Sequence, residues 1–273
     1  MRLFFILLIS ILFAPVVKCE ERIAVAFYDV GRLYDTIPSN FYNDKSYTPK
    51  GRNRWGSARY LQKMESIVAV IDSMQMPIVA LAGIEKEEVV RDIVRRSNQD
   101  YSYLHRTIDY YDGLDFALLY YGDMFYVERV NSTNYTLVVR GEIDGKIVTF
   151  HLARVGSRMR TIEPMDGDEK SDIDIAWGRL TRDDILRLGL KDQMREAEVA
   201  GHGDTKGDLS WYFKSRVGVG LAEGQRAESG VYITEWLLTS DRSAPLATFS
   251  SNRYYGGYSN HLPLFLYIYF DEQ

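Results

Sequence analysis

The stretch IVALAGIEKEEVV, residues 78–90, decides the class of fold that we expect. Its first half is an unbroken apolar run, as in a strand that is buried on both faces, and its second half is an acidic turn that leads into a helix. In α/β hydrolases the end of such a strand is where a metal-binding carboxylate is expected. Here the strand ends at Ala82 and Gly83, and the first carboxylate, that of Glu85, comes two residues later.

The segments on either side extend this pattern. Residues 22–30 are apolar and β-branched, which predicts a strand. From residue 60 the apolar residues recur every three or four positions, which predicts a helix with one buried face, made by Leu61, Met64, Ile67, Val68, Ile71 and Met74. Val89 and Val90 begin the inward face of a second helix. The order strand–helix–strand–helix is typical of α/β proteins.

Four strands with short turns are predicted next, over residues 114–121, 124–130, 135–143 and 146–153. The dipeptide Asp144-Gly145 between the last two is a strong hairpin signal. We predict a helix over 173–188 and further strands near 196–201, 209–217, 230–239 and 262–270. Since no repeat or linker interrupts this order, the sequence predicts an α/β domain of two packed mixed β-sheets flanked by helices, a four-layer sandwich.

Residues 1–19 have the pattern of a secretory signal peptide. One early Arg precedes an apolar run over residues 3–17, which is too short and wrongly flanked for a stable membrane span. Cleavage after Cys19 would release a soluble domain of residues 20–273 to the periplasm or the exterior. The alternative is lipidation of Cys19, which the preceding Lys18 disfavours. No later apolar stretch is long enough for a transmembrane segment.

The cysteine content and the net charge restrict how the fold is stabilised and which molecules the protein can bind. Cys19 is the only cysteine, so the fold depends on packing without an intramolecular disulfide. Loss of Arg2 and Lys18 with the signal peptide would change the formal net charge from −5 to −7. A negative surface repels phosphate backbones, so the charge argues against nucleic acid as a partner.

Four stretches, in this order along the chain, resemble the motifs of one enzyme family. They are FYDVGRLYD at 27–35, YTPKGRNRWGSARYLQKMESIVAVI at 47–71, GLDFALLY at 113–120 and SNHLPLF at 259–265. The set resembles the endonuclease/exonuclease/phosphatase superfamily, in particular its secreted bacterial members. The resemblance implies a DNase-I-like fold. It also implies hydrolysis of phosphodiester or phosphomonoester bonds with a divalent cation, Mg²⁺ or Mn²⁺.

The residues that this resemblance assigns to the metal differ here. The family's metal-binding glutamate aligns with Gly83, and Glu85 aligns with a second glutamate that does not bind the metal. Asp29 replaces an asparagine near the first strand and can still bind a cation. Because strand residues two apart share a face, Glu85 is an alternative metal ligand.

The other catalytic motifs are kept in part. His151 retains the histidine of an Asn-His pair, and Asp204 retains the possible base of a Gly-Asp-Phe-Asn motif in which Lys206 replaces the asparagine. His261 retains the final histidine, but Asn260 replaces the aspartate that steadies it. In serine proteases a comparable Asp-to-Asn change costs roughly 10⁴ in rate.

Three further features have more than one interpretation. Asp115 is either a retained phosphate-site residue or an acid at a strand start that its neighbours satisfy. Lys206 and Asn260 are candidate ligand-binding residues, since a cation in a former metal site could bind phosphate or sulfate without cleaving it. The Gly-rich stretch 201–208 is either a rearranged metal site or a turn.

Two functional hypotheses follow from these substitutions. In the first, the chain is a secreted, catalytically degenerate member of this fold that binds an anionic or glycan ligand, or another protein. In the second, it is an active divalent-metal-dependent phosphodiesterase, nuclease or phosphatase that uses a shifted set: Asp29, Glu85, Asp204 and His261. Convergence of these carboxylates in space would favour the second.

Overall fold

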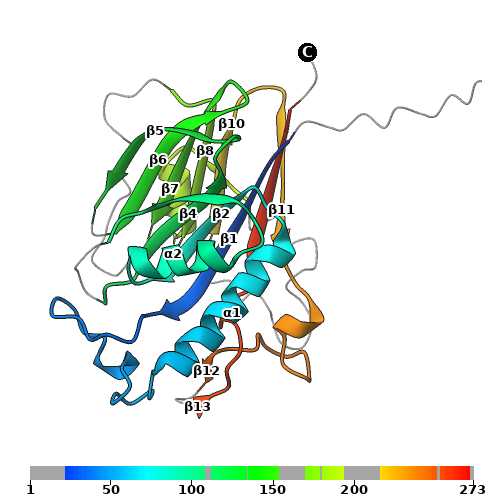
Figure 1. Ribbon diagram of the computed structural model, residues 1–273. Coiled ribbons are helices and arrows are strands. Elements are labelled where there is room, and N and C mark those ends of the chain that lie inside the picture. Colours follow the sequence, from blue (N-terminus) through cyan, green and yellow to red (C-terminus); the bar gives the residue numbers. More distant parts are fainter. Residues whose placement is uncertain are drawn as a thin grey trace, which may run out of the picture.

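Two six-stranded β-sheets pack face to face in the computed structural model (Figure 1). The structure describes residues 22–107, 112–133, 135–153, 170–178, 180–193, 216–250 and 253–270. Each sheet contains a parallel pair of strands among antiparallel ones, so both are mixed. The predicted fold class, α/β with two packed mixed sheets, is therefore confirmed.

The first sheet is built around the N-terminal strand. Its order is β11 (Gln225–Val231), β14 (Leu264–Phe270), β1 (Arg22–Leu33), β2 (Ile78–Ile84), β4 (Asp115–Tyr121) and β3 (Tyr101–His105). β1 and β2 are parallel and α1 (Ser57–Met74) connects them, as predicted from the helical spacing. α2 (Glu87–Arg96) follows β2 and buries Val89, Val90 and Ile93.

The second sheet continues the chain after β4. Its order is β5 (Tyr126–Ser132), β6 (Thr136–Ile143), β7 (Lys146–Ala153), β8 (Ile173–Gly178), β10 (Arg216–Leu221) and β9 (Lys191–Asp192). β6 and β7 form the predicted hairpin, in which Ile143 pairs with Lys146. Asp144 and Gly145 both have positive φ there, as a tight hairpin turn requires.

Helices cover the outer faces of the sheets, which gives four layers. α1 and α2 lie over the first sheet (Figure 1). α3 (Arg182–Arg187) lies on the second sheet, where Ile185 packs in a small cluster with Ala176 and Leu190. The shorter elements are η1 (Lys45–Tyr47), η3 (Glu235–Leu237), β12 (Phe249–Ser250) and β13 (Arg253–Tyr254). Among the described helices, none combines the length and the apolar character that a membrane crossing needs.

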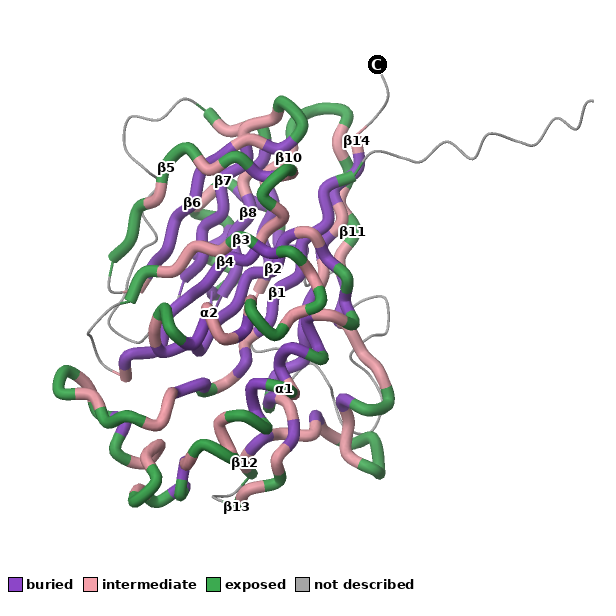
Figure 2. Tube along the Cα trace, in the orientation of Figure 1, coloured by how far each residue is buried: buried purple, intermediate pink, exposed green. Residues whose placement is uncertain are grey.

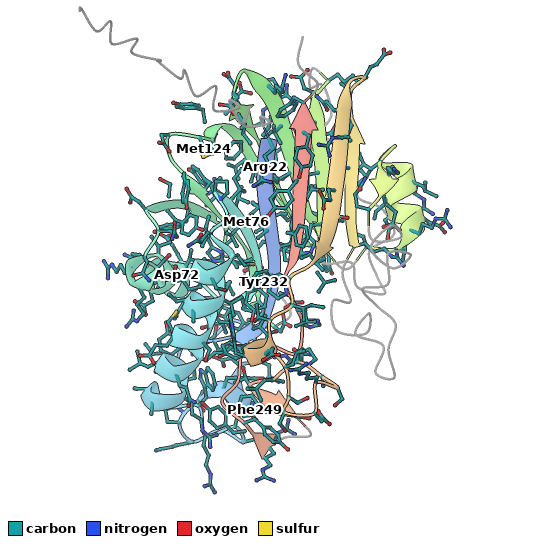
Figure 3. All side chains as sticks on the ribbon, turned by 90° about the vertical axis from the view of Figure 1, so that its right-hand side faces the viewer. Arg22, Asp72, Met76, Met124, Tyr232 and Phe249 are labelled. Atoms are coloured by element: carbon teal, nitrogen blue, oxygen red, sulfur yellow. The ribbon has the colours of Figure 1, made fainter. Side chains whose placement is uncertain are left out.

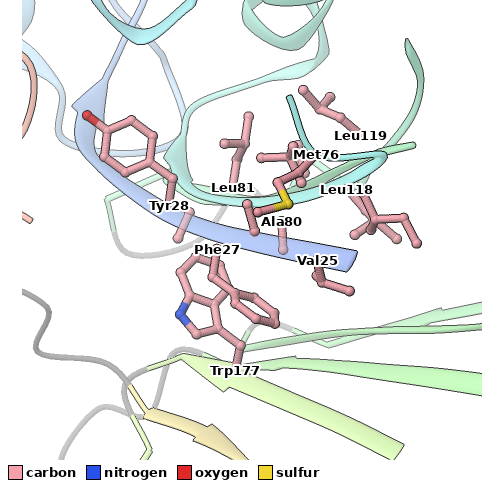
Figure 4. Close-up of a cluster of buried hydrophobic side chains, with 14 of the residues drawn as sticks. Val25, Phe27, Tyr28, Met76, Ala80, Leu81, Leu118, Leu119 and Trp177 are labelled. Atoms are coloured by element: carbon pink, nitrogen blue, oxygen red, sulfur yellow. The ribbon is translucent and has the colours of Figure 1, made fainter. Parts of the chain in front are cut away.

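The core lies between the two sheets. Buried segments follow the central strands of both sheets, while exposed ones lie at the periphery (Figure 2). Trp177 of β8 reaches across to Phe27 of β1, with ring centroids 5.4 Å apart (Figure 4). It also contacts Phe116 of β4, at 6.0 Å between ring centroids. This aromatic contact joins the sheets next to the ends of β1 and β2.

The predicted helix over 173–188 is wrong over its first half. Residues 173–178 form β8, and only 182–187 are helical. Ile173, Ala176 and Trp177 have a helical spacing in the sequence, but Ile173, Ile175 and Trp177 all point into the core with the period of a strand. Contacts with β7 and β10 on either side decide the conformation here.

The later strands match only in part. Of the strand predicted over 230–239, only the first two residues belong to β11, and the chain then turns into η3. The strand predicted over 262–270 is confirmed by β14. Residues 196–201 lie outside the described residues, and of 209–217 only 216 and 217 are described, where they begin β10.

Gly83 lies at an irregularity where β2 ends beside β1. Its φ is +87°, and the pairing register shifts there in both the β1–β2 and the β2–β4 ladders. A Cβ at this position would come within 3.0 Å of the carbonyl oxygen of Gly31 on β1, closer than real Cβ atoms come. The end of β2 therefore has no room for a side chain at residue 83.

Removal of the inter-sheet indole should be costly. We expect Trp177→Ala to lower the free energy of unfolding by about 3–5 kcal/mol, because a fully buried aromatic is replaced by a cavity. Urea denaturation measures this change, with Tyr126→Ala, at a tyrosine that is 61% exposed, as the control. A loss for Trp177→Ala no larger than that of the control would contradict this account of the core.

A pair of glycine substitutions separates backbone strain from steric exclusion at residue 83. Gly83 and Gly145 both have positive φ, but a Cβ at Gly145 meets no atom within 4 Å. Gly145→Ala should therefore cost about 1–2 kcal/mol from strain alone, and Gly83→Ala clearly more. Equal losses in thermal or urea denaturation would show that the contact with Gly31 excludes nothing.

Candidate functional site

The end of β1 and the segment before β14 bring Asp29 and His261 together. His261 Nε2 lies 3.6 Å from Asp29 Oδ2, and the histidine is 5% exposed. Ser259 orders both residues: its hydroxyl donates to the Asp29 carbonyl oxygen at 2.7 Å and accepts from the His261 amide at 3.1 Å. A half-buried carboxylate paired with a buried imidazole, toward the carboxyl end of a central strand, is thus a fixed feature of the fold.

A small cavity of about 60 Å³ opens between the ends of the two sheets. Asp29 and Arg32 of β1 and Gly83 of β2 line one side, and Trp177 lines the other. Asp112, just before β4, adds a second carboxylate to the lining. This cavity, which we call the inter-sheet cavity, is at the position where the resemblance puts the metal.

A larger cavity of about 270 Å³ adjoins it and shares Gly31 and Arg32. Lys63 of α1 lines it, together with Asn260 and His261 before β14, so we call it the α1 cavity. Phe249 in its wall lies at the end of the molecule where α1 begins (Figure 3). Asn260 is exposed, so it stands where solvent reaches the cavity.

Lys63 was not predicted as a functional residue. It is only 2% exposed, and its ammonium donates to the carbonyl oxygens of Val30, at 2.8 Å, and Tyr258. Burial lowers the pKa of Lys63 to about 7, against the opposing effect of the Asp29 carboxylate. A lysine inside the apolar stripe of a predicted helix is the sequence signal that could have identified it.

Glu85 has a different partner set from the one that a metal ligand needs. Its carboxylate accepts hydrogen bonds from the Asp35 amide at 2.6 Å and from the Tyr42 hydroxyl at 2.9 Å. It is 1% exposed and lines neither cavity. Burial raises the pKa of Glu85 to about 7, which the hydrogen bonds from Asp35 and Tyr42 partly oppose. The residue anchors the segment after β1 through these two hydrogen bonds.

The structure does not bring His151 or Asp115 to these cavities. His151 lies 3.2 Å from Asp174 on the outer face of the second sheet, because its neighbours Phe150 and Leu152 point into the core. Asp115 precedes Phe116, which lines the inter-sheet cavity, and alternation turns Asp115 to the opposite face of β4. Their catalytic roles stay predictions.

Asp204 and Lys206 lie outside the described residues, as does the Gly-rich stretch 201–208 that contains them. Of the predicted site residues, the structure therefore groups Asp29, Asn260 and His261. Arg32 and Lys63 complete this group, although sequence reasoning missed both.

The described residues do not fit a divalent cation. Within them, no three His, Cys, Asp or Glu side chains lie close enough together to hold a metal ion. Gly83, where the resemblance puts the family's metal-binding glutamate, packs on the Gly31 backbone, and Glu85 faces elsewhere. The described part of the site therefore supplies an imidazole, carboxylates and two cationic side chains, but no set of ligands for a metal ion.

Several solved structures share this fold. An endonuclease/exonuclease/phosphatase from Bacteroides vulgatus is 12% identical, with a TM-score of 0.55 over 92% of this chain and 100% of that one. Danio rerio TDP2, complexed with a single-strand DNA product, is 11% identical, with a TM-score of 0.54 over 91% and 99%. A mannosyl-6-phosphatase of Bacteroides thetaiotaomicron is 12% identical, with a TM-score of 0.52 over 91% and 100%. At these identities the likeness shows the fold.

A search of curated proteins gave no match. A family model, in contrast, matches the sequence itself. The model of the Endonuclease/Exonuclease/phosphatase family matches residues 24–166, more than half of the chain, including β1, α1, β2 and the β6–β7 hairpin. The chain therefore belongs to the endonuclease/exonuclease/phosphatase family.

Proposed function

We propose that this chain is a catalytically degenerate member of its family, which binds an anionic or glycan ligand at the end of β1 without cleaving it. One observation carries the proposal: Gly83 occupies the place of the metal-binding glutamate and has no room for a side chain. Asp29, Arg32, Lys63 and His261 remain around the cavities and offer charge and hydrogen bonds to a ligand.

Energetics support this proposal over an active site with a shifted metal. A divalent cation supplies several kcal/mol of charge stabilisation to phosphoryl transfer, and each 1.36 kcal/mol is a factor of ten in rate. The alternative set needs Glu85 at the metal, but its carboxylate is held by Asp35 and Tyr42. To release Glu85 would break both hydrogen bonds and free the segment that they anchor.

We also propose that the protein is exported and acts as the soluble domain 20–273. The signal-like pattern of residues 1–19 supports this, with cleavage after Cys19 rather than lipidation. The negative net charge supports a small ligand or a protein, rather than nucleic acid, as the partner.

Hydrolysis assays test the loss of catalysis. The protein would be given bis(p-nitrophenyl) phosphate, p-nitrophenyl phosphate and plasmid DNA with Mg²⁺, Mn²⁺ or Ca²⁺, beside a His261→Ala control. We expect no turnover above that of the control, because the metal ligand is missing. Metal-dependent turnover that disappears in His261→Ala would refute the proposal and favour the set Asp29, Glu85, Asp204 and His261.

The anchoring role of Glu85 has a pH signature. An unfolded chain has this carboxyl at an ordinary pKa of about 4.3, whereas burial raises it to about 7 in the fold. Between these values the folded state keeps a proton that the unfolded chain releases. The stabilisation is thus complete below about pH 4.3 and is lost as the pH rises through 7.

We therefore expect the free energy of unfolding of the natural protein to fall by about 2–3 kcal/mol relative to Glu85→Gln as the pH rises from about 4.5 to 7.5. Urea denaturation of both proteins across this range measures the difference. A difference that does not change with pH would mean that Glu85 keeps an ordinary pKa in the fold, which would contradict this account of its environment.

A further inference from the structure

The α1 cavity contains a buried cation with unused hydrogen-bonding capacity. The Lys63 ammonium has three N–H bonds, and it gives two of them to Val30 and Tyr258. Within the described residues, no other hydrogen-bond acceptor is recorded for it. Because Lys63 is only 2% exposed, its ammonium loses most of its hydration, and an anion in the cavity would compensate for that loss.

Charge decides what kind of anion fits. The formal charges around the cavity are positive on Lys63 and Arg32 and negative on Asp29, whose carboxylate interacts with Lys63. Among the described residues that line the cavity, the other titratable groups are Tyr47 and His261. Formally, two cations against one carboxylate leave one positive charge, and an anion beside Lys63 favours its protonated form, so the surroundings suit a single negative charge. A phosphate monoester, with a second pKa near 6, would bring close to two charges toward Asp29.

Size and surface restrict the rest of the ligand. About 270 Å³ is below the range of about 300–1,000 Å³ that is common for drug-sized ligands, so the cavity suits one small ring. Tyr47 and Phe249 form an aromatic wall, with ring centroids 6.1 Å apart, against which an apolar ring face can pack. Asn260, which is exposed, and Thr248 add polar groups for hydroxyls.

We propose that the α1 cavity binds a sugar-sized molecule through a singly charged oxyanion, a carboxylate or a sulfate ester, held by Lys63 at the inner wall and Arg32 at the outer rim. This inference rests on the proposed function, because it names the ligand class of a cleft that binds without cleaving. Lys63 supplies the buried charge, and the planar guanidinium of Arg32 can pair with two oxygens at once.

Isothermal titration calorimetry with four probes tests the proposal: glucuronate, glucose 6-sulfate, glucose 6-phosphate and glucose. We expect saturable binding of glucuronate, of glucose 6-sulfate or of both, and the comparison of these two identifies the oxyanion. Glucose 6-phosphate should bind at least about tenfold more weakly, and glucose should not bind measurably. Binding of glucose 6-phosphate as tight as that of the singly charged probes would overturn the charge argument, as would no binding of any probe.

Variants connect binding to the cavity. Arg32→Gln should weaken binding by about 10-fold or more, since a hydrogen-bonded charge is lost. Asn260→Asp should weaken it too, because it adds a negative charge. Arg91→Gln removes a partly exposed arginine on α2 that does not line the cavity, and this variant should bind normally. If Arg32→Gln and Arg91→Gln bind equally well, the site is elsewhere and the proposal fails.

Lys63→Met should abolish binding, but it also removes hydrogen bonds that hold the backbone, so Arg32→Gln is the deciding variant. The two proposals fail in different ways. Hydrolysis of glucose 6-phosphate or of the p-nitrophenyl esters would end the claim of lost catalysis. Glucuronate has no phosphate to hydrolyse, so its binding tests the cavity independently of that claim.

Discussion

The rest of the site depends on the contact between the backbones of Gly83 and Gly31. Two central parallel strands approach each other so closely at their ends that no side chain fits between them. This contact needs a glycine with positive φ at residue 83, and it shifts the register of β2 against both neighbours. Where a metal site would present a glutamate, this fold presents backbone.

That constraint also explains the position of Glu85. In a regular strand, residues 83 and 85 would share a face, but the irregularity at Gly83 breaks the alternation. Glu85 then points to the segment after β1 and receives hydrogen bonds from Asp35 and Tyr42. The Glu85 carboxylate thus stabilises the segment that follows β1. A glutamate at residue 83 would meet the Gly31 carbonyl oxygen, so this backbone has no room for one.

The sequence predicted the architecture well, because its signals there are periodic. The β1–α1–β2–α2 order, the Asp144-Gly145 hairpin and the last strand all match the structure. The helix prediction was wrong for residues 173–178 because Ile173, Ala176 and Trp177 fit a helical spacing. In the structure, pairing with β7 and β10 makes this segment a strand. A local sequence pattern does not indicate which neighbouring strands a segment will pair with.

The site was less predictable, for a geometric reason. Alignment of motifs identified Gly83, Asp29, Asn260 and His261, which do lie at the ends of β1, β2 and β14. It could not show that a bulge turns Glu85 away or that His151 lies on the outer face of β7. Lys63 was missed because the buried face of this helix was predicted from its apolar residues alone. Its two backbone acceptors lie 33 and 195 residues away in the chain.

Those two hydrogen bonds from Lys63 have a mechanical consequence. They join the middle of α1, the end of β1 and the segment before β14 through a single ammonium. None of these three segments can swing away from the others without leaving a buried charge unsatisfied, which is costly. The inner wall of the α1 cavity therefore behaves as one rigid body. The route between solvent and the cavity lies where Arg32 and Asn260 of its lining are exposed.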